Sequence, residues 1–276
     1  MLLPDHSTEE LEVGLLLEAI NARYGYDFRD YAPGTIQRRM RNALKKSGAA
    51  NLGDLQHRVL TDPDVFALVF SSLTIQVTEM FRDPTFYLAF RERVVPMLRT
   101  YPHIKIWHAG CATGEEVYST AILLAEEGLS ERTQIYATDI SSAAIDLARE
   151  GIYPEQRIGE FVRSYSAAGG KGSIQSFLTT GYGNLTFNQS VRQNIVFFQH
   201  DLVSDYALGE MQVVLCRNVL IYFGTTLAGK VISTLRDAVC RGGFLCLGRS
   251  ERLPNRLDLG FEEYVDDERI YRRGLS

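Results

Sequence analysis

The chain has 276 residues, of which 45% are hydrophobic and 23% charged, and its formal net charge is −5. This composition is typical of a globular protein with one large domain or two, and the net acidity gives no general attraction to nucleic acid. The N-terminal residues lack a signal-peptide pattern, and no apolar run approaches the roughly 20 residues that a membrane helix needs. Because the four cysteines show no metal-binding spacing, we expect reduced thiols, no metal site and a cytoplasmic location.

Helical periodicity dominates residues 8–95, behind the helix caps Ser7 and Thr8. Asp62-Pro63 indicates another helix start. Three sets of apolar residues recur at helical spacing: Leu11, Leu15, Leu16, Ala19 and Ile20; Ile36, Met40 and Leu44; and Val65, Leu68, Val69 and Leu73. We therefore predict an all-helical N-terminal domain over residues 1–85.

After Pro102 the pattern changes to short apolar runs that alternate with helical stretches, which is typical of a mostly parallel sheet. The predicted strands lie near 104–109, 134–138, 195–199, 211–216 and 243–248, and the predicted helices near 115–127, 141–150 and 225–240. Near the end, 261–265 and 269–273 predict an antiparallel hairpin at one sheet edge. The fold class is therefore α/β over residues 86–276.

Residues 165–194 do not fit this alternation, because they are rich in Gly, Ser, Thr and Asn. A structureless loop of this length is uncommon inside a compact domain. We predict a small antiparallel β insertion with strands around Ile174–Leu178 and Leu185–Phe187, and a disordered excursion is the alternative.

The most informative segment joins the first two predicted strands. The strand ending at Ala109 is followed by the glycine turn Gly110–Gly114 and by a helix that begins with Glu115-Glu116, and the next strand ends on Asp139. This order is typical of the nucleoside-binding half of an open α/β sheet, in which the acid accepts hydrogen bonds from ribose hydroxyls. Two carboxylates at a helix N-terminus would repel a pyrophosphate but suit an amino group and a sulfonium cation. The pattern therefore favours S-adenosylmethionine (SAM).

These residues also have purely structural interpretations. Tight turns need glycine in many folds, and acids in a first helical turn complement the helix dipole. Asp139 could equally cap a helix that starts at Ser141. An NAD-dependent oxidoreductase is disfavoured by the glutamate pair and by the missing third glycine of its fingerprint.

Two further segments carry candidate site residues. Arg217 and Asn218 follow an apolar predicted strand, at the edge where open parallel sheets bind ligands. Tyr222 lies one helical turn beyond Asn218 and could face the same site or simply pack the sheet. Thr78 and Arg82 lie one above the other if this segment is helical, and the alternative for Arg82 is a solvated side chain.

Five segments occur in one order: Thr-x-x-Phe-Arg-Asp at 78–83, AGCATGEEVYS at 109–119, ATDIS at 137–141, CRNVLIYF at 216–223 and LGRSE at 247–251. In this arrangement the sequence resembles the CheR-type family of chemotaxis receptor glutamate O-methyltransferases, from about residue 11 to 273. The resemblance implies a Rossmann-like SAM-dependent methyltransferase sheet behind an all-helical substrate-recognition domain. It also implies SAM as the methyl donor and S-adenosyl-L-homocysteine (SAH) as the product.

The resemblance assigns roles to the positions that match the family's motifs. Arg82 and Tyr222 match the residues implied in catalysis, where they would orient the reacting groups. One member of the glutamate pair would contact the methionine amino end, and the acid after the second strand would contact the ribose. The implied SAM-contacting positions are Gln76, Thr78, Arg82, Gly110, Glu115, Glu116, Asp139, Asp201, Leu202, Cys216, Arg217 and Asn218. Gln76 and Asp201 stand where the family has asparagine.

The implied substrate is a glutamate side chain on the cytoplasmic helices of a chemoreceptor, whose carboxylate is ionised at pH 7 and needs no general base. We expect the basic segment between Ile36 and Lys46 to bind this partner, through Arg38, Arg39, Arg41, Lys45 and Lys46. A solvated helix face is the alternative. Nucleic acid is not expected, because no aromatic residues interleave this patch. We also expect a monomer without membrane insertion.

Two other functions fit the same residues. One is a SAM-dependent methyltransferase with a different acceptor, although the sequence lacks the Asn- or Asp-Pro-Pro-aromatic motif of base methylation. The other is a SAM-binding signalling adaptor without catalysis. In some family members the β insertion docks a receptor peptide, a role that we do not predict here.

Overall fold

The computed structural model describes residues 7–74, 78–253 and 259–275. The chain forms two compact units, Met1–Ile75 with Ile221–Lys230 and Gln76–Leu220 with Val231–Ser276. The first unit is helical, and the second is built around a sheet. Among the described residues, no helix is long and apolar enough to cross a bilayer.

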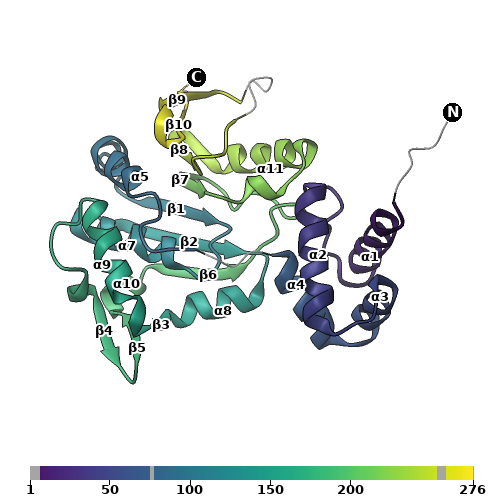
Figure 1. Cartoon of the computed structure of the whole chain (residues 1–276). Helices are drawn as coiled ribbons and strands as arrows, with labels where there is room; N and C mark the ends of the chain where they lie inside the picture. The colour runs from purple at the N-terminus through teal and green to yellow at the C-terminus, as the bar shows by residue number, and fades with distance from the viewer. Residues whose placement is uncertain (1–6, 75–77, 254–258, 276) are drawn as a thin grey trace. The chain divides into compact units, whose positions relative to one another are not determined.

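The helical unit contains α1 (Thr8–Tyr24), α2 (Pro33–Ser47), α3 (Leu52–Thr61) and α4 (Pro63–Leu73) (Figure 1). The predicted cap at Ser7 is confirmed by a capping box with Glu10, whereas Thr8 is the first residue of α1; the predicted helix start at Asp62 is confirmed, since its side chain accepts the Asp64 N–H. The predicted apolar face of α1 is partly wrong, since Leu11 and Leu15 are 56% and 59% exposed. The buried residues of α1 are Val13, Leu16, Leu17 and Ile20.

A distant segment of the chain, Ile221–Lys230, also belongs to the helical unit. Tyr31 and Phe223 form an antiparallel bridge, and their rings meet edge to face at 4.9 Å. The Ala32 N–H donates to the Tyr222 carbonyl at 2.9 Å. Backbone pairing therefore attaches this segment to the helices, which local sequence patterns did not indicate.

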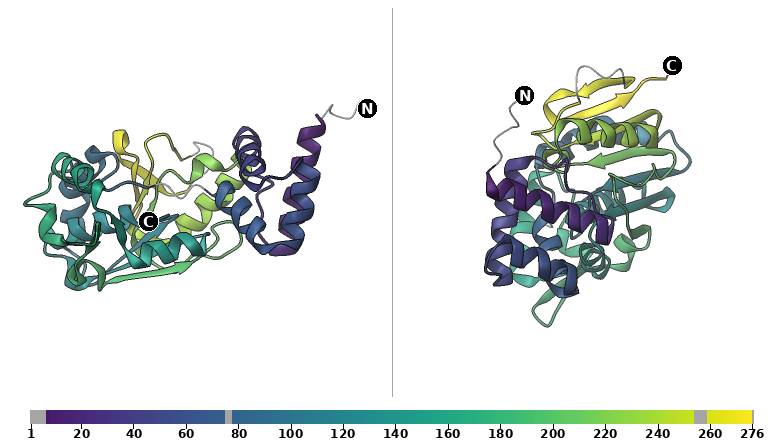
Figure 2. Two further views of the ribbon diagram at one scale, coloured as in Figure 1. Left: turned by 60° about the horizontal axis from the view of Figure 1, so that its bottom comes forward. Right: turned by 90° about the vertical axis from the view of Figure 1, so that its right-hand side faces the viewer.

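The main sheet of the α/β unit has the strand order β6-β2-β1-β7-β8-β10-β9. Its strands are β1 (Ile104–Ala109), β2 (Thr133–Asp139), β6 (Ile195–Gln199), β7 (Met211–Cys216), β8 (Val239–Leu247), β9 (Phe261–Val265) and β10 (Ile270–Arg273). The pairs among β6, β2, β1, β7 and β8 are parallel, and the yellow hairpin β9–β10 is antiparallel at one edge (Figures 1 and 2). The predicted α/β fold is confirmed, with β8 starting at Val239 rather than 243.

Helices connect these strands much as predicted. They are α7 (Glu115–Glu126), α8 (Ser142–Glu150) and α11 (Thr225–Ala238). Before β1 the chain forms α5 (Pro84–Ala89), a π-helical turn (Phe90–Val94) and α6 (Val95–Leu98). Residues 78–83 are not helical, so the predicted helical stacking of Thr78 on Arg82 is wrong. The reason is local, because Phe81 and Asp83 have left-handed φ angles of 50° and 55°.

The predicted β insertion is present but begins earlier than expected. A second sheet has the order β3-β5-β4, formed by β3 (Ile152–Pro154), β4 (Leu178–Gly181) and β5 (Asn184–Phe187). In the chain, α9 (Ile158–Ala167) lies between β3 and β4, and α10 (Gln189–Arg192) follows β5. The prediction of a strand at 174–178 is wrong, since Ile174–Phe177 form a 3-10 turn and β4 starts at Leu178.

Candidate functional site

The polar residues that follow the strands meet at one edge of the main sheet. β1 lies between β2 and β7, and the chain proceeds from β1 to β2 on one side while β7 and β8 extend the sheet on the other. Open α/β sheets bind ligands at such a reversal, outside the carboxyl ends of the strands. Gly110, Asp139 and Arg217 stand at the ends of β1, β2 and β7, so the structure brings these three predicted positions together.

Hydrogen bonds within the protein close the glycine turn after β1. The N–H groups of Gly110 and Cys111 both donate to the Thr138 carbonyl at 2.8 Å. The Ala112 N–H donates to Oδ2 of Asp139 at 2.9 Å. These donors are therefore not available to cradle a phosphate, which fits a nucleoside that carries none.

Gly110 and Gly114 are required by packing as well as by backbone conformation. Their φ angles are 83° and 91°, in the left-handed region. A Cβ atom on Gly110 would lie 2.5 Å from Cγ2 of Val219, and one on Gly114 would lie 2.9 Å from Cβ of Ala148. Protein atoms thus fill the space beside Gly110, and only its backbone is left to meet a ligand.

Asp139 organises the loop that follows β2. One carboxylate oxygen accepts the Ala112 N–H, and the other accepts the Ser141 N–H at 3.0 Å. Burial raises the pKa of Asp139 above its ordinary value, against the effect of these hydrogen bonds. Ser141 is the residue that caps α8, through a bond from the Ala144 N–H. With the Ile140 N–H as a third backbone donor, the carboxylate keeps about one of its roughly four acceptor positions, which suits a ribose hydroxyl.

The two glutamates at the start of α7 have separate partners. Glu115 pairs with Arg157 at 2.6 Å and accepts the Thr113 hydroxyl at 2.6 Å. Glu116 pairs with Arg217 at 2.8 Å and lies 3.3 Å from Nδ1 of His108. Burial opposes ionisation of Glu116, but Arg217 and His108 hold the pKa of its carboxyl below the ordinary value.

Arg217 connects three of the sequence motifs. Its side chain is 1% exposed and pairs with Asp83 and Glu116, each at 2.8 Å. Both terminal nitrogens also lie 3.4 Å from the Arg82 carbonyl, and the guanidinium stands 4.0 Å from the centre of the Phe86 ring. The guanidinium therefore binds protein groups and is not available to bind a ligand directly.

Arg82 has the opposite arrangement, because its backbone carbonyl rather than its guanidinium contacts Arg217. The preceding Phe81 N–H donates to Oγ of Ser119 at 2.8 Å, and Arg217 binds both the Arg82 carbonyl and the Asp83 carboxylate. Among the described residues, none accepts a hydrogen bond from the Arg82 guanidinium. Ser119 was missing from the sequence prediction, although it closes the motif at 109–119.

The motif at 247–251 supports the end of β7. The Asn218 N–H donates to Oε2 of Glu251 at 2.8 Å, and the same oxygen accepts the Gly248 N–H at 2.6 Å. Asn218 has a left-handed φ of 61°, and the following 3-10 turn covers only Leu220–Tyr222. The predicted helical turn from Asn218 to Tyr222 is therefore wrong. Glu251 had been noted only as part of a motif and given no role.

The remaining predicted cofactor positions are placed as follows. Asp201 accepts a backbone N–H two residues further on at 2.8 Å. Leu202 and Cys216 are buried, and burial raises the pKa of the Cys216 thiol well above its ordinary value. Thr78 is half-buried, and Gln76 lies outside the described residues.

The predicted substrate-binding residues all lie on α2 in the helical unit. An open groove of about 500 Å³ is lined by Arg38, Arg39, Arg41, Asn42, Lys45 and Ser72. Lys46 is exposed on the same helix. Arg41 pairs with Glu9 at 2.6 Å, whereas Arg38 and Lys45 form no ion pair within the described residues.

Arg39 differs from the other basic residues of α2, because it is 5% exposed. Its guanidinium donates to the Leu73 carbonyl and lies 4.3 Å from the centre of the Tyr222 ring. Tyr222 is half-buried, and its segment is held by the bridge to Tyr31. Arg39 thus packs against the predicted catalytic tyrosine rather than on the exposed face of α2.

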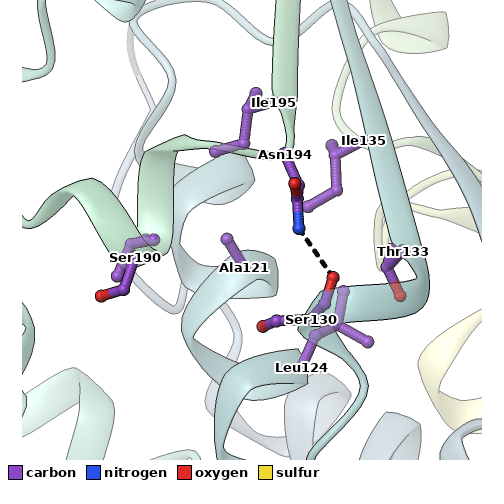
Figure 3. A pocket seen from close by; sticks show the side chains of 9 residues that line it. Ala121, Leu124, Ser130, Thr133, Ile135, Ser190, Asn194 and Ile195 are labelled. Atoms are coloured by element: carbon purple, nitrogen blue, oxygen red, sulfur yellow. Dashed lines mark hydrogen bonds between the residues drawn. The ribbon is translucent and has the colours of Figure 1, made fainter.

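One small cavity lies away from this site (Figure 3). Its volume is about 10 Å³, room for a single water, and its polar lining includes the 2.7 Å bond from Asn194 to the Ser130 carbonyl. Thr133 and Ile195 lie at the amino ends of β2 and β6. The cavity is therefore at the opposite end of the strands from the site and has no part in the function argued below.

The fold and the site together define a SAM-dependent methyltransferase: a mostly parallel sheet with an antiparallel edge hairpin, an acid at the end of β2, and a glycine turn whose first three N–H groups bind protein acceptors. Residues 76–265 match the family described as CheR methyltransferase, SAM binding domain, and residues 12–74 match CheR methyltransferase, all-alpha domain. The chain belongs to the CheR methyltransferase family, as its sequence motifs had indicated.

Named relatives cover nearly the same length. The Pseudomonas putida protein named Cher3 is 46% identical over 96% of this chain and 97% of its own. Chemotaxis protein methyltransferase 1 of Vibrio cholerae is 30% identical over 81% of this chain and 82% of its own. The N-methyltransferase NodS of Bradyrhizobium japonicum, solved with SAH, is 13% identical, with a TM-score of 0.34 over 61% of this chain and 62% of its own. That last similarity is too low to support an argument.

Proposed function

We propose that this protein forms γ-methyl esters on glutamate side chains of the cytoplasmic helices of chemoreceptors, with SAM as the methyl donor. The proposal goes further than the family assignment, which establishes the methyltransferase class. Relatives named chemotaxis protein methyltransferases support a receptor substrate. A cytoplasmic, monomeric enzyme is part of the same proposal.

The residues at the site suit a nucleophile that is already ionised. A glutamate side chain has a pKa near ~4.3, so at pH 7 its carboxylate attacks without help from a base. SAM, when bound, supplies an electrophilic methyl group on a sulfonium. The thiols of Cys111 and Cys216 have pKa values raised by burial, and His108 is buried against Glu116. The protein's task is therefore to hold the carboxylate in line, at about 3–3.5 Å from the methyl carbon.

The observation that carries this proposal is the state of Arg82. Its backbone is clamped by Arg217 and Ser119, while its guanidinium has no partner among the described residues. A cation presented on a fixed backbone is suited to orienting a carboxylate through its planar donor fork. Tyr222 is proposed as the second catalytic residue, because it matches the family's active-site tyrosine. Its proposed role is to orient a reacting group through its hydroxyl.

The exposed basic residues of α2 are proposed to bind the receptor. Arg38, Arg41, Lys45 and Lys46 offer positive charge to an acidic helix, and added salt should weaken this contact because exposed charges are screened. Arg39 is proposed to support this surface from below rather than to touch the receptor. The groove on α2 also offers Asn42 as a hydrogen-bonding side chain.

The proposal is tested with SAM labelled in its methyl group and a cytoplasmic fragment of a methyl-accepting chemoreceptor. We expect label in the fragment as base-labile esters that release methanol, at glutamates located by peptide mass analysis. Arg82→Lys should lower the rate about 100-fold, since one fixed donor group is lost, while SAM binding stays measurable by calorimetry. Arg163→Lys, an exposed arginine of α9, serves as the control.

Each alternative function predicts a different outcome of this experiment. SAM binding without transfer to any receptor fragment would favour an adaptor. Label in nucleic acid or a small molecule, but not in the receptor, would favour another acceptor. Full turnover by Arg82→Lys would remove that residue from the proposed catalytic pair.

A further inference from the structure

The β insertion contacts the end of the glycine turn and the start of α7, at Thr113 and Glu115. From β3, the Tyr153 hydroxyl donates to the Thr113 carbonyl at 2.6 Å. From the 3-10 turn that follows, Arg157 pairs with Oε1 of Glu115 at 2.6 Å. The Thr113 hydroxyl donates to the other Glu115 oxygen at 2.6 Å, which closes a small network. The end of the glycine turn is thus held from outside the main sheet.

The insertion holds both of these side chains in place. Tyr153 is buried, and its ring meets those of Phe161 and Phe187 edge to face at 6.0 and 5.8 Å. Arg157 also pairs with Glu160 at 3.1 Å, and its guanidinium lies 5.1 Å from the centre of the Phe161 ring. Two anchored donors therefore approach one turn, and neither position belongs to the five sequence motifs.

We propose that Arg157 and Tyr153 are positioning residues for SAM, so that the insertion completes the cofactor site. They act through Glu115 and the Thr113 carbonyl, which they hold at the start of α7. This inference rests on the SAM-dependent family assignment and not on the identity of the methyl acceptor. It gives the insertion a role even where it docks no receptor peptide.

The physical reason lies in the burial of Glu115, whose side chain is 2% exposed. At this depth the carboxylate is held by its ion pair with Arg157, so removal of Arg157 leaves it buried without its cation and lets it leave its position. That movement would alter the shape of the turn at the start of α7, where the methionine part of SAM is implied to bind. The Tyr153 hydroxyl holds the neighbouring carbonyl, and its loss frees the same turn without a change of charge.

The test is a double-mutant cycle with SAH as the probe. In calorimetry, Arg157→Gln should weaken SAH binding about tenfold or more, because a hydrogen-bonded charge pair is lost. Tyr153→Phe should weaken it about threefold, and Arg163→Gln should match the wild type. Because Arg157 acts through Glu115, its substitution should have little further effect in a Glu115→Gln background.

Kinetics and a conservative variant separate positioning from general damage. Arg157→Gln should raise the KM for SAM with kcat nearly unchanged at saturating SAM, and Arg157→Lys should recover part of the affinity. Wild-type SAH affinity in Arg157→Gln, or multiplicative effects of Arg157→Gln and Glu115→Gln, would overturn the proposal. If Arg157→Gln does not fold, Tyr153→Phe and Arg157→Lys decide by the same readout. SAH binding needs no acceptor, so failure of receptor methylation leaves this result interpretable.

Discussion

Removal of the Arg217 side chain should strongly destabilise the α/β unit. Arg217→Met keeps an apolar side chain of similar length, so contact with Phe86 is largely retained. The substitution leaves the carboxylates of Glu116 and Asp83, which are 14% and 25% exposed, without their shared cation. Breaking a buried ion pair by removing one partner costs about 3–5 kcal/mol, and we expect a loss of this size. For a unit of this size that corresponds to a fall in Tm of roughly 6–20 °C.

The assay is urea unfolding followed by tryptophan fluorescence. Trp107 is the only tryptophan of the chain and is buried in β1, so its signal reports on the α/β unit. Arg149→Met is the matched control, because its pair with Asp146 is exposed and should contribute less than about 1 kcal/mol. Replacing Glu116 and Asp83 by their amides in the Arg217→Met background should recover part of the loss, since the stranded charges are removed.

The pH dependence provides a second check on the same reasoning. The lowered pKa of Glu116 in the folded protein stabilises it above the ordinary value of 4.5, and this contribution is lost as pH falls through the lowered value. Without Arg217, burial dominates and raises the pKa of Glu116. Protonation of Glu116 on acidification then removes the buried, unpaired charge that destabilises the variant. The stability difference should therefore shrink on acidification. A difference below about 1 kcal/mol at pH 7, or one that does not change with pH, would refute the argument.

Two further predictions concern the ends of β2 and β8. Because burial raises the pKa of Asp139 and its ionised form is the one that accepts ribose hydroxyls, SAH affinity should fall on acidification already above the ordinary value of 3.8. Calorimetry over pH should show this loss in the wild type, and persistence of the same profile in Asp139→Asn would contradict the assignment. Gly248→Ala should cost about 1–3 kcal/mol in urea unfolding, because its Cβ would lie 2.8 Å from the Asn218 amide nitrogens. Gly181→Ala meets nothing within 4 Å, and equal stability loss in both variants would count against this packing argument.

Several strands and helix caps could be predicted from short stretches of the sequence. β1 and β7 follow from short apolar runs, as expected for strands buried in a parallel sheet, and β2 and the more exposed edge strand β6 also follow from apolar runs. The caps at Ser7 and Asp62 follow from side chains that accept a nearby backbone N–H. The order of the motifs was also sufficient to indicate the family.

Other features depended on partners that are distant in the sequence. The exposed face of α1 at Leu11 and Leu15 was misjudged, because spacing shows where apolar residues recur but not which side the other helices cover. The alignment of Thr78 with Arg82 required a helix, but Phe81 and Asp83 have left-handed φ angles and bind the distant residues Ser119 and Arg217. The attachment of Tyr222 to the helical unit through Ala32 was likewise invisible in sequence.

The sequence by itself thus indicated which residue types meet at the predicted cofactor site, since strand ends and glycine turns place them at one sheet edge. Only the tertiary structure decided which of these charged side chains form ion pairs with one another. Glu115 is paired with Arg157 of the insertion, Glu116 with Arg217, and Arg82 keeps a free guanidinium among the described residues. Ion pairing is a matter of distance in space, and chain folding brings together charges that no local pattern relates.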